Sequence, residues 1–316
     1  MNKKILFIDN AHPILIDDLK LAGFQCDYFP DYSLKDYEKI IPEYFGVIIR
    51  SKILMDRQMI DKAIHLKFIG RVGAGMESID VEYAEGKGIA CLNSPEGNRD
   101  AVGEHALGML LCLFNKFKFA DLQMREGIRD REANRGIEIK GKTIGIVGYG
   151  NMGSAFAQRL KGFEANVMAY DKYKKGFGNE YVKEVDLDSI FRNADIISFH
   201  VPLTKETAYM FDEVFIRKFK KEFYLINTAR GGIVKTDALV DALKSGKVIG
   251  ACLDVIEYEK FSFEEIKVNQ LPPAYLYLIN AENVLLSPHV AGWTVESKYK
   301  LAKVLADKIK AKFCNP

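Results

Sequence analysis

In the second half of the chain, an arginine and a histidine each stand just after an apolar run that reads as a buried strand. Arg230 follows the run at residues 223–227, and His289 follows the run at 284–286. Ligands of an open parallel sheet bind beyond the carboxyl ends of its strands, so the two side chains should converge there. An arginine can hold a carboxylate with two parallel hydrogen bonds and polarise a carbonyl, while a histidine exchanges a proton at neutral pH. Together they indicate hydride chemistry on a small acid that carries a hydroxyl or carbonyl group.

A carboxylate beside the imidazole would orient it and favour its charged form. Three acidic residues are candidates, because Asp254 ends the apolar run at 249–253 and Glu257 and Glu259 follow shortly after it. Spacing alone does not choose between the two glutamates. His200 ends a different run, and we expect it to line a cofactor site rather than to catalyse.

A glycine-rich turn follows the apolar run at residues 143–147, and it has the spacing of a dinucleotide-binding fingerprint. Gly148 suits a tight turn, Gly150 lets a phosphate approach the backbone, and Gly153 lets helix and strand pack closely. A helix is predicted after the turn, at 154–161, and its start would offer N–H groups to phosphates. Asp171 ends the next strand, 18 residues after Gly153, where an acid holds the adenosine ribose.

The position of Asp171 favours NAD over NADP, because a carboxylate there repels a 2′-phosphate. Lys172, Lys174 and Lys175 follow it directly and weaken this inference.

Two basic loops in the first hundred residues could bind an acidic substrate. Arg50, Ser51 and Lys52 follow one predicted strand, and the segment Arg71-Val72-Gly73-Ala74-Gly75 follows another. Backbone amides at the glycines could bind a carboxylate, and the basic side chains could bind a phosphate. The alternative is that these loop residues are merely solvated.

Composition narrows the class of protein. The chain has 316 residues, enough for two domains, and a formal net charge of +2, which indicates neither a nucleic-acid nor an anionic-membrane surface. No apolar stretch is long enough to span a bilayer. The five cysteines are scattered without paired spacing, so we expect reduced thiols in a cytoplasmic protein and no metal site.

Alternating strand and helix signals predict parallel sheets with helices on both faces, an α/β fold of two doubly wound domains. Because the glycine turn lies mid-chain, we expect a Rossmann dinucleotide domain at residues 100–290, inserted into a flavodoxin-like substrate domain formed by 1–99 and 291–316. Six strands are expected in the inserted domain, along with a long helix at 101–119 and a charged surface excursion at 121–140. The last helix, 295–313, should return to the first domain.

The chain resembles the D-isomer-specific 2-hydroxyacid dehydrogenases along nearly its whole length. The resemblance lies in the glycine turn and in seven further segments, at residues 70–75, 93–98, 101–106, 200–204, 227–232, 253–255 and 287–292. It implies Arg230 as the substrate-binding arginine, Glu259 as the partner of the histidine and His289 as the acid/base. It also implies two domains with a cleft, domain closure and a homodimer built on the cofactor domain.

The resemblance also implies the other ligand contacts. Arg50 and the loop from Gly70 look most like phosphoglycerate dehydrogenases, which implies 3-phosphoglycerate as the substrate and a phosphate held by the basic loops. Substrate contacts are then expected from Arg50, Ser51, Arg71, Val72, Gly73 and Ala74. NAD contacts are expected from Gly148, Gly150, Asn151, Met152, Gly153, Asp171, His200, Pro202, Thr207, Thr228, Ala229, Asp254 and Val102.

The chain departs from the family after Glu259, where Lys260 replaces the usual proline. The aromatic and acidic segment at 261–277 follows, which we interpret as a lid or a dimer contact. No additional carboxy-terminal regulatory domain is expected. Two alternatives stay open: a glyoxylate or hydroxypyruvate reductase that uses the same residues without a phosphate site, and a non-catalytic NAD(H)-sensing protein that acts through partners.

Overall fold

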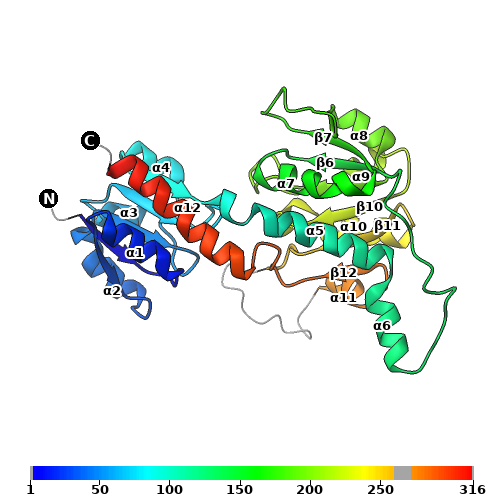
Figure 1. Ribbon diagram of the computed structural model, residues 1–316, viewed down its shortest axis with the longest axis horizontal. Helices are drawn as coiled ribbons and strands as arrows, with labels where there is room; N and C mark the ends of the chain where they lie inside the picture. Colours follow the sequence, from blue (N-terminus) through cyan, green and yellow to red (C-terminus); the bar gives the residue numbers. More distant parts are fainter. Residues whose placement is uncertain (1–2, 260–271, 315–316) are drawn as a thin grey trace. The chain divides into compact units, whose positions relative to one another are not determined.

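The computed structural model describes residues 3–259 and 272–314. The chain forms two compact units, and Figure 1 labels their helices and strands. Unit 1 comprises Met1–Arg99 with Trp293–Pro316, and unit 2 comprises Asp100–Gly292. Unit 2 ends at Gly292, two residues later than the expected end at residue 290. Most of the expected lid or dimer segment, residues 260–271, lies outside the described residues.

Unit 1 contains a five-stranded parallel sheet in the order β2-β1-β3-β4-β5. This is the flavodoxin-like order, so the predicted fold class is confirmed for this unit. Its strand β2 was not predicted, because the sequence Gln-Cys-Asp-Tyr is half polar and forms a sheet edge. The strands are β1 (Lys4–Phe7), β2 (Gln25–Tyr28), β3 (Gly46–Ile49), β4 (Phe68–Arg71) and β5 (Ala90–Asn93).

Helices cover both faces of this sheet, and β1 shows how the sequence achieves this. Ile5 and Phe7 pack with α1 (Pro13–Leu21) and α12 (Val295–Phe313), whereas Leu6 and Ile8 pack on the opposite side. That side is covered by α2 (Leu34–Ile40), α3 (Arg57–Lys62) and α4 (Val81–Gly86). In Figure 1 the red α12 lies beside the blue α1, and the two helices are in contact. The last helix thus packs on the first helix of the chain, within unit 1.

Unit 2 contains a seven-stranded parallel sheet in the order β12-β11-β10-β9-β6-β7-β8. The strand order reverses between β6 and β9, which is the point where doubly wound sheets bind dinucleotides. Six of its strands were predicted; β8 was missed because it has only three residues, of which two are charged. The strands are β6 (Thr143–Val147), β7 (Asn166–Tyr170), β8 (Val182–Glu184), β9 (Ile196–Phe199), β10 (Phe223–Asn227), β11 (Val248–Leu253) and β12 (Val284–Leu286).

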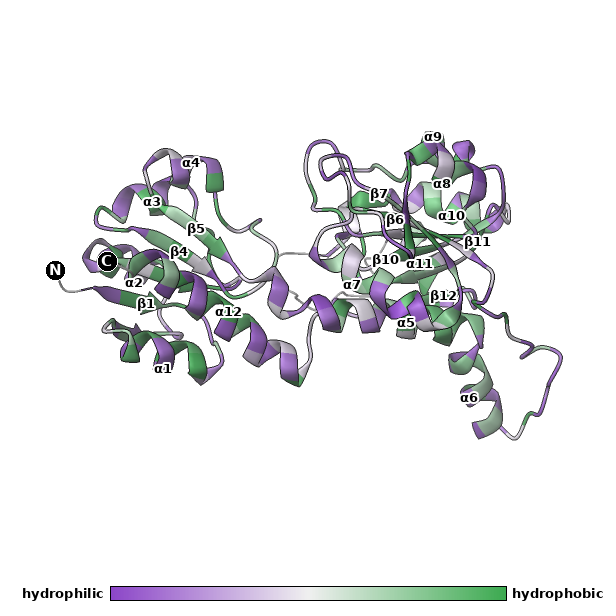
Figure 2. Ribbon diagram, turned by 45° about the horizontal axis from the view of Figure 1, so that its top comes forward, coloured by the Kyte–Doolittle hydropathy of each residue, from purple (hydrophilic) through white to green (hydrophobic). Residues whose placement is uncertain are grey.

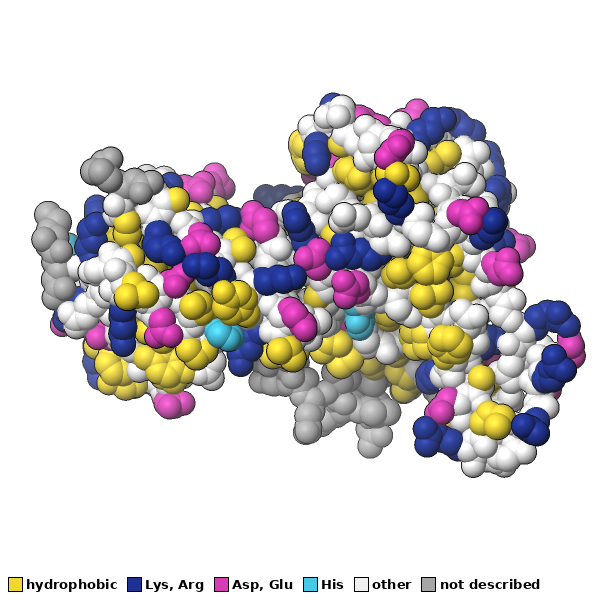
Figure 3. Space-filling model, in the orientation of Figure 1, with side chains coloured by type: hydrophobic (Ala, Val, Ile, Leu, Met, Phe, Trp, Pro, Cys, Tyr) yellow, Lys and Arg dark blue, Asp and Glu magenta, His cyan; other side chains and the backbone are white. Residues whose placement is uncertain are grey.

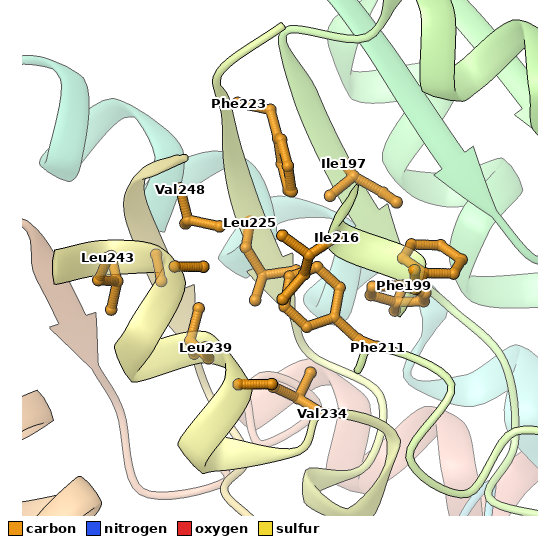
Figure 4. Close-up of a cluster of buried hydrophobic side chains, with 14 of the residues drawn as sticks. Ile197, Phe199, Phe211, Ile216, Phe223, Leu225, Val234, Leu239, Leu243 and Val248 are labelled. Carbon is orange, nitrogen blue, oxygen red and sulfur yellow. The ribbon is translucent and has the colours of Figure 1, made fainter. Parts of the chain in front are cut away.

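Two apolar layers enclose this sheet. One layer contains α5 (Arg99–Phe114) and α7 (Asn151–Leu160); the other contains α8 (Leu187–Asn193), α9 (Glu213–Lys218), α10 (Thr236–Lys244) and α11 (Pro273–Asn280). Figure 4 shows the second layer, where Phe199, Phe223 and Leu225 of the strands face Ile216 and Leu239 of the helices. In Figure 2 the strands are mostly green, whereas the helices mix green with purple, as amphipathic helices over a buried sheet do.

The predicted helix at 101–119 is wrong in its end. Helix α5 stops at Phe114, Lys116 adopts a left-handed conformation with φ 51°, and a separate helix, α6 (Phe117–Arg125), begins. The apolar pattern continues through this break, so the pattern alone could not reveal it. Helix α6 also occupies the start of the expected surface excursion. None of the helices in the described ranges is both long and apolar enough to cross a bilayer.

Candidate active site

A histidine–glutamate pair stands at the carboxyl end of the unit 2 sheet. Nδ1 of His289, just past β12, lies 2.8 Å from Oε2 of Glu259, which follows β11. The two side chains are partly buried, with 30% and 23% of their surfaces exposed. The other oxygen of Glu259 accepts a hydrogen bond from the Ile256 amide at 3.1 Å, which fixes the carboxylate against its own loop. With Nδ1 facing the carboxylate, proton exchange with a ligand would take place at Nε2.

The two glutamates that spacing could not separate have different partners. The Glu257 carboxylate accepts a hydrogen bond from the Thr236 amide at 2.9 Å, at the first residue of α10. The Glu257 carboxylate therefore stabilises the positive end of that helix, and Glu259 is the glutamate that pairs with the imidazole of His289.

Arg230 lies in the loop after β10, and a glycine packs this loop against the loop that carries Glu259. A Cβ on Gly231 would lie 1.8 Å from the carbonyl oxygen of Ile256. Nη1 of Arg230 donates to the carbonyl of Ala229 at 2.6 Å, and the side chain of Asn227 bonds the carbonyl of Arg230 and the amide of Ala229. These contacts bring the loops of Arg230 and Glu259 together at one edge of the sheet.

Asp254 is completely buried, and its carboxylate is taken up by the segment that carries His289. Oδ1 accepts from the Ser287 hydroxyl at 2.6 Å and from the Val290 amide at 2.9 Å, and Oδ2 accepts from the Ala291 amide at 2.8 Å. Burial raises the pKa of Asp254, but hydrogen bonds from His105, Ser287 and these two amides outweigh it and keep the pKa below its ordinary value. The Asp254 side chain therefore binds the segment around His289, and its expected contact with NAD stays a prediction.

The backbone of the glycine turn fits a dinucleotide phosphate. Gly148 has φ +93°, and a Cβ there would lie 2.5 Å from the carbonyl oxygen of His200, so only glycine makes this turn without strain. A Cβ on Gly153 would lie 2.0 Å from the carbonyl oxygen of Gly148, which explains the close approach of helix and strand. Gly150 has open space around it and precedes α7 without a side-chain cap among the described residues. The first amides of α7 could therefore bind a phosphate.

Asp171 is joined to the same turn. Its Oδ2 accepts from the amide of Tyr149 at 2.8 Å, and its Oδ1 accepts from the amides of Tyr173 and Lys174, both at 2.9 Å. Burial raises the pKa of Asp171, but these backbone hydrogen bonds outweigh it and lower the pKa overall. The carboxylate is therefore ionised at neutral pH, beside the turn, as a ribose ligand should be.

Each lysine after Asp171 has a partner within the protein. Lys172 pairs with Glu206 at 2.6 Å, Lys174 donates to the carbonyl of Tyr149 at 3.3 Å, and Lys175 donates to the carbonyl of Asp171 at 3.1 Å. The lysines are thus less available to attract a 2′-phosphate than their number in the sequence suggests.

The remaining expected cofactor residues lie at several places in unit 2. Asn151 and Met152 form the first turn of α7, and Val102 is buried in the first turns of α5. The Thr207 hydroxyl donates to the carbonyl of Pro202 at 2.6 Å and so closes the loop after β9. The Thr228 hydroxyl is buried and has no hydrogen-bond partner among the described residues, which a bound polar group beside Ala229 would relieve.

The ring of His200 points into the protein. Its Nε2 lies 2.8 Å from the Ser198 hydroxyl, and its ring lies 5.4 Å from that of Phe156. Burial lowers the pKa of His200 to about 3, so the imidazole is neutral at physiological pH. Any contact with a cofactor from this residue would come from its backbone.

The basic loops of unit 1 already hold an internal carboxylate. One oxygen of Asp9 accepts from the amides of Arg50, Ser51 and Lys52 at 2.5, 3.1 and 3.3 Å, so only side chains remain for a ligand. The Arg50 guanidinium lies 4.6 Å from the centre of the Trp293 ring. Burial lowers the pKa of Arg50, while the Asp9 carboxylate acts in the opposite direction.

The second basic loop is held by β5 and its continuation. The Gly73 amide donates to the Ser94 hydroxyl at 3.2 Å, and the Asn93 side chain donates to the carbonyl of Ala74 at 2.7 Å. A Cβ on Gly73 would lie 1.9 Å from Nη1 of Arg71, so that guanidinium folds over the glycine. Val72 is buried, with 7% of its surface exposed, and can offer a ligand only its backbone.

The sequence predicts His105 to be structural or solvated and indicates no role for Trp293. Nε2 of His105, on α5, lies 2.9 Å from the Ser287 hydroxyl and 3.4 Å from Oδ1 of Asp254. The first contact joins residues 182 positions apart, so no local pattern could have indicated it. The rule that ligands bind beyond strand ends, which pointed to His289, says nothing about a side chain on a helix that covers the sheet.

The sequence and fold of the chain are similar to those of known proteins. Residues 107–291 match the family described as D-isomer specific 2-hydroxyacid dehydrogenase, NAD binding domain. A D-3-phosphoglycerate dehydrogenase of Archaeoglobus fulgidus is 34% identical over 308 residues, which cover 97% of this chain and 56% of that protein. The chain therefore spans little more than half the length of this relative.

Two further relatives are matched over most of their length. A hydroxypyruvate reductase of Thermotoga maritima is 36% identical over 271 residues, which cover 86% of this chain and 85% of the relative. The structure of a D-lactate dehydrogenase from Aquifex aeolicus, complexed with NAD and lactic acid, superposes with a TM-score of 0.82 at 27% identity and covers 98% of this chain and 95% of that one.

Proposed function

Since the chain belongs to the D-isomer-specific 2-hydroxyacid dehydrogenase family, we propose that it catalyses reversible, NAD-dependent oxidation of a small D-2-hydroxy acid at C2. The observation that carries this proposal is the pairing of His289 with Glu259 at 2.8 Å, beyond the carboxyl ends of β11 and β12. An imidazole held by a carboxylate at the ligand-binding edge of a dinucleotide sheet is suited to proton exchange with a substrate oxygen.

Three side chains have distinct roles in this proposal. In the oxidation direction, Nε2 of His289 takes the proton of the C2 hydroxyl, while Glu259 stabilises the imidazolium that forms. Arg230 binds the carboxylate of the substrate and polarises the C2 oxygen. Bound NAD supplies the hydride acceptor. In the reduction direction, His289 returns the proton to the same oxygen.

A panel of 2-keto acids with NADH tests the activity: 3-phosphohydroxypyruvate, hydroxypyruvate, glyoxylate and pyruvate. His289→Ala should lower kcat by at least about 10²-fold, the usual scale of general acid–base catalysis, while NADH affinity changes little. An unchanged kcat would remove His289 from the mechanism. Absence of turnover on the whole panel would favour the alternative of an NAD(H)-sensing protein.

NAD rather than NADP is the proposed cofactor. The ionised Asp171 beside the glycine turn and the internal partners of Lys172, Lys174 and Lys175 support it. Titration of the intrinsic fluorescence of the protein with NADH and NADPH gives both affinities directly. Tighter binding of NADPH would refute this choice, and Asp171→Ser should narrow the difference between the two affinities.

For the substrate, we propose 3-phosphoglycerate and its 2-keto form. The name of the Archaeoglobus relative and the guanidinium groups of Arg50 and Arg71 in unit 1 support this choice. The matched Thermotoga enzyme supports the second candidate, a hydroxypyruvate or glyoxylate reductase. Arg71→Ala separates the two, because a loss confined to phosphorylated substrates is expected only for the first.

We also propose that the protein is a cytoplasmic homodimer assembled through unit 2. Helix α6 supports this, because Phe117, Leu122 and Met124 expose 58%, 50% and 55% of their surfaces. A cavity of about 630 Å³ lies beside the helix, lined partly by Tyr224 and Ile249. Figure 3 shows hydrophobic side chains, in yellow, at the surface around α5 and α6. Sedimentation equilibrium tests the dimer, and Leu122→Lys should shift the protein toward monomer.

A further inference from the structure

We propose that His105 is a positioning residue for His289, acting through Ser287 and Asp254. The proposal rests on the proposed function, because it assigns His105 a part in the same proton exchange. His105 comes from α5, a helix that contributes no side chain to the histidine–glutamate pair.

The backbone at His289 needs support from its surroundings. Its φ of +55° lies in the left-handed region, which non-glycine residues seldom adopt. Such a conformation persists only where neighbouring contacts determine it. The direction of the imidazole toward Glu259 therefore depends on what holds residues 287–291.

Asp254 supplies several of these contacts. Its carboxylate binds the Ser287 hydroxyl and the amides of Val290 and Ala291, and its backbone carbonyl accepts from the His289 amide at 2.8 Å. These bonds hold the segment before, at and after His289. Because Asp254 directly follows β11, it also ties the segment to the rigid sheet.

The order of donors places His105 at the start of this network. An ionised carboxylate only accepts hydrogen bonds, so the Ser287 hydroxyl must be the donor in its 2.6 Å hydrogen bond to Asp254. The hydroxyl oxygen is then an acceptor toward His105, and Nε2 of His105 must carry the proton across the 2.9 Å contact. The chain of donation runs from His105 through Ser287 to Asp254.

This arrangement fixes the Ser287 hydroxyl in one direction and joins the His289 segment to a second element. Removing the imidazole leaves the Ser287 oxygen without this donor and takes away the group 3.4 Å from Oδ1 of Asp254. Asp254 still ties the segment to β11, but the position of Ser287 is less firmly fixed. A small displacement of a reacting group is enough to slow a positioned proton transfer.

His105→Leu removes the donor, and His105→Gln keeps an N–H near the position of Nε2. We expect His105→Leu to lower kcat on the order of tenfold, with the dissociation constant for NADH, measured by fluorescence, close to that of the wild type. His105→Gln should recover most of the lost kcat. His65→Leu, the same exchange at an exposed histidine of unit 1, is the control and should leave kcat unchanged.

A double-mutant cycle tests the route through Ser287. Ser287→Ala should lower kcat by a similar factor, and the double variant with His105→Leu should be little worse than either single variant, because both break one chain of contacts. Multiplying effects would show that the two residues act independently and would overturn the proposal.

A wild-type kcat in His105→Leu, or equal losses in the Leu and Gln variants at equal melting temperature, would overturn the positioning role. If the wild type itself turns over no 2-keto acid, the proposed function fails first, and this is visible before any variant is made.

Discussion

Gly231→Ala should separate the loop of Arg230 from the loop of Glu259. The added Cβ would lie 1.8 Å from the carbonyl oxygen of Ile256, 2.1 Å from its carbonyl carbon and 2.7 Å from the amide nitrogen of Glu257. All three atoms belong to the backbone, so no side-chain rotation relieves the overlap.

The size of the effect follows from these distances. The first contact is about 1.6 Å closer than the 3.4 Å at which ordinary van der Waals contact begins, so one loop must move by more than about 1 Å. Ile256 lies three residues before Glu259 and donates its amide to that carboxylate, so the movement reaches the partner of His289. Misplacement by about 1 Å can cost on the order of 10²-fold in rate, and overpacking costs about 1–3 kcal/mol of stability.

The neighbouring glycine provides a matched control. A Cβ on Gly232 would meet only the side chain of Leu203, at 3.3 and 3.4 Å, and a leucine methyl can yield by a few tenths of an ångström. Steady-state kinetics on the best substrate of the panel, with NADH affinity from fluorescence, should show kcat about 10²-fold lower in Gly231→Ala and nearly unchanged in Gly232→Ala. NADH affinity should stay close to that of the wild type in both.

Wild-type kcat in Gly231→Ala would refute the reasoning, because it would mean that the two loops can part without disturbing the site. Equal damage in both variants would refute it as well, since the distances predict a difference between adjacent positions.

Three further predictions concern charge and packing. Glu259→Gln should lower kcat by about 10²-fold at unchanged NADH affinity, whereas Glu257→Gln should chiefly lower the melting temperature by weakening the start of α10. Burial lowers the pKa of His200 to about 3, so its imidazole stays neutral in the folded protein, whereas in the unfolded chain it binds a proton below about pH 6.5. The free energy of unfolding should therefore fall by up to about 1.4 kcal/mol per pH unit as the pH drops from 6.5 toward 3. Urea unfolding should show this slope in the wild type, and its persistence in His200→Gln would contradict the assignment. Gly97→Ala, whose Cβ would lie 2.5 Å from the backbone of α12, should destabilise unit 1 by about 1–3 kcal/mol, and Gly86→Ala, with open space around it, should not.

The architecture was largely predictable because buried parallel strands appear in sequence as short apolar runs between turn residues. The two strands that were missed, β2 and β8, lie at sheet edges and carry polar side chains. The break at Lys116 was hidden because phenylalanines on either side continue the apolar pattern across it.

The sequence pointed to residues of the candidate site, but it did not predict the contacts between their side chains. The rule that ligands bind at strand ends pointed to Arg230 and His289. Spacing did not choose between Glu259 and Glu257, because both lie within a few residues of β11. The family resemblance favoured Glu259, and the geometry of the loop gives each glutamate a different partner. The link from His105 to Ser287 is a contact between distant parts of the chain, which only the packed fold creates.

The return of α12 to unit 1 bears on the order in which the protein folds during synthesis. Ala302, Leu305, Ala306 and Ile309 complete the apolar layer over Ile5 and Phe7, yet the ribosome makes these residues only after all of unit 2. Unit 2 is contiguous and can fold as soon as it emerges, whereas the part of the first sheet that α12 covers, beside α1, stays exposed until then. The nascent chain thus carries apolar side chains of unit 1 that find their packing partners only when the last helix has been made.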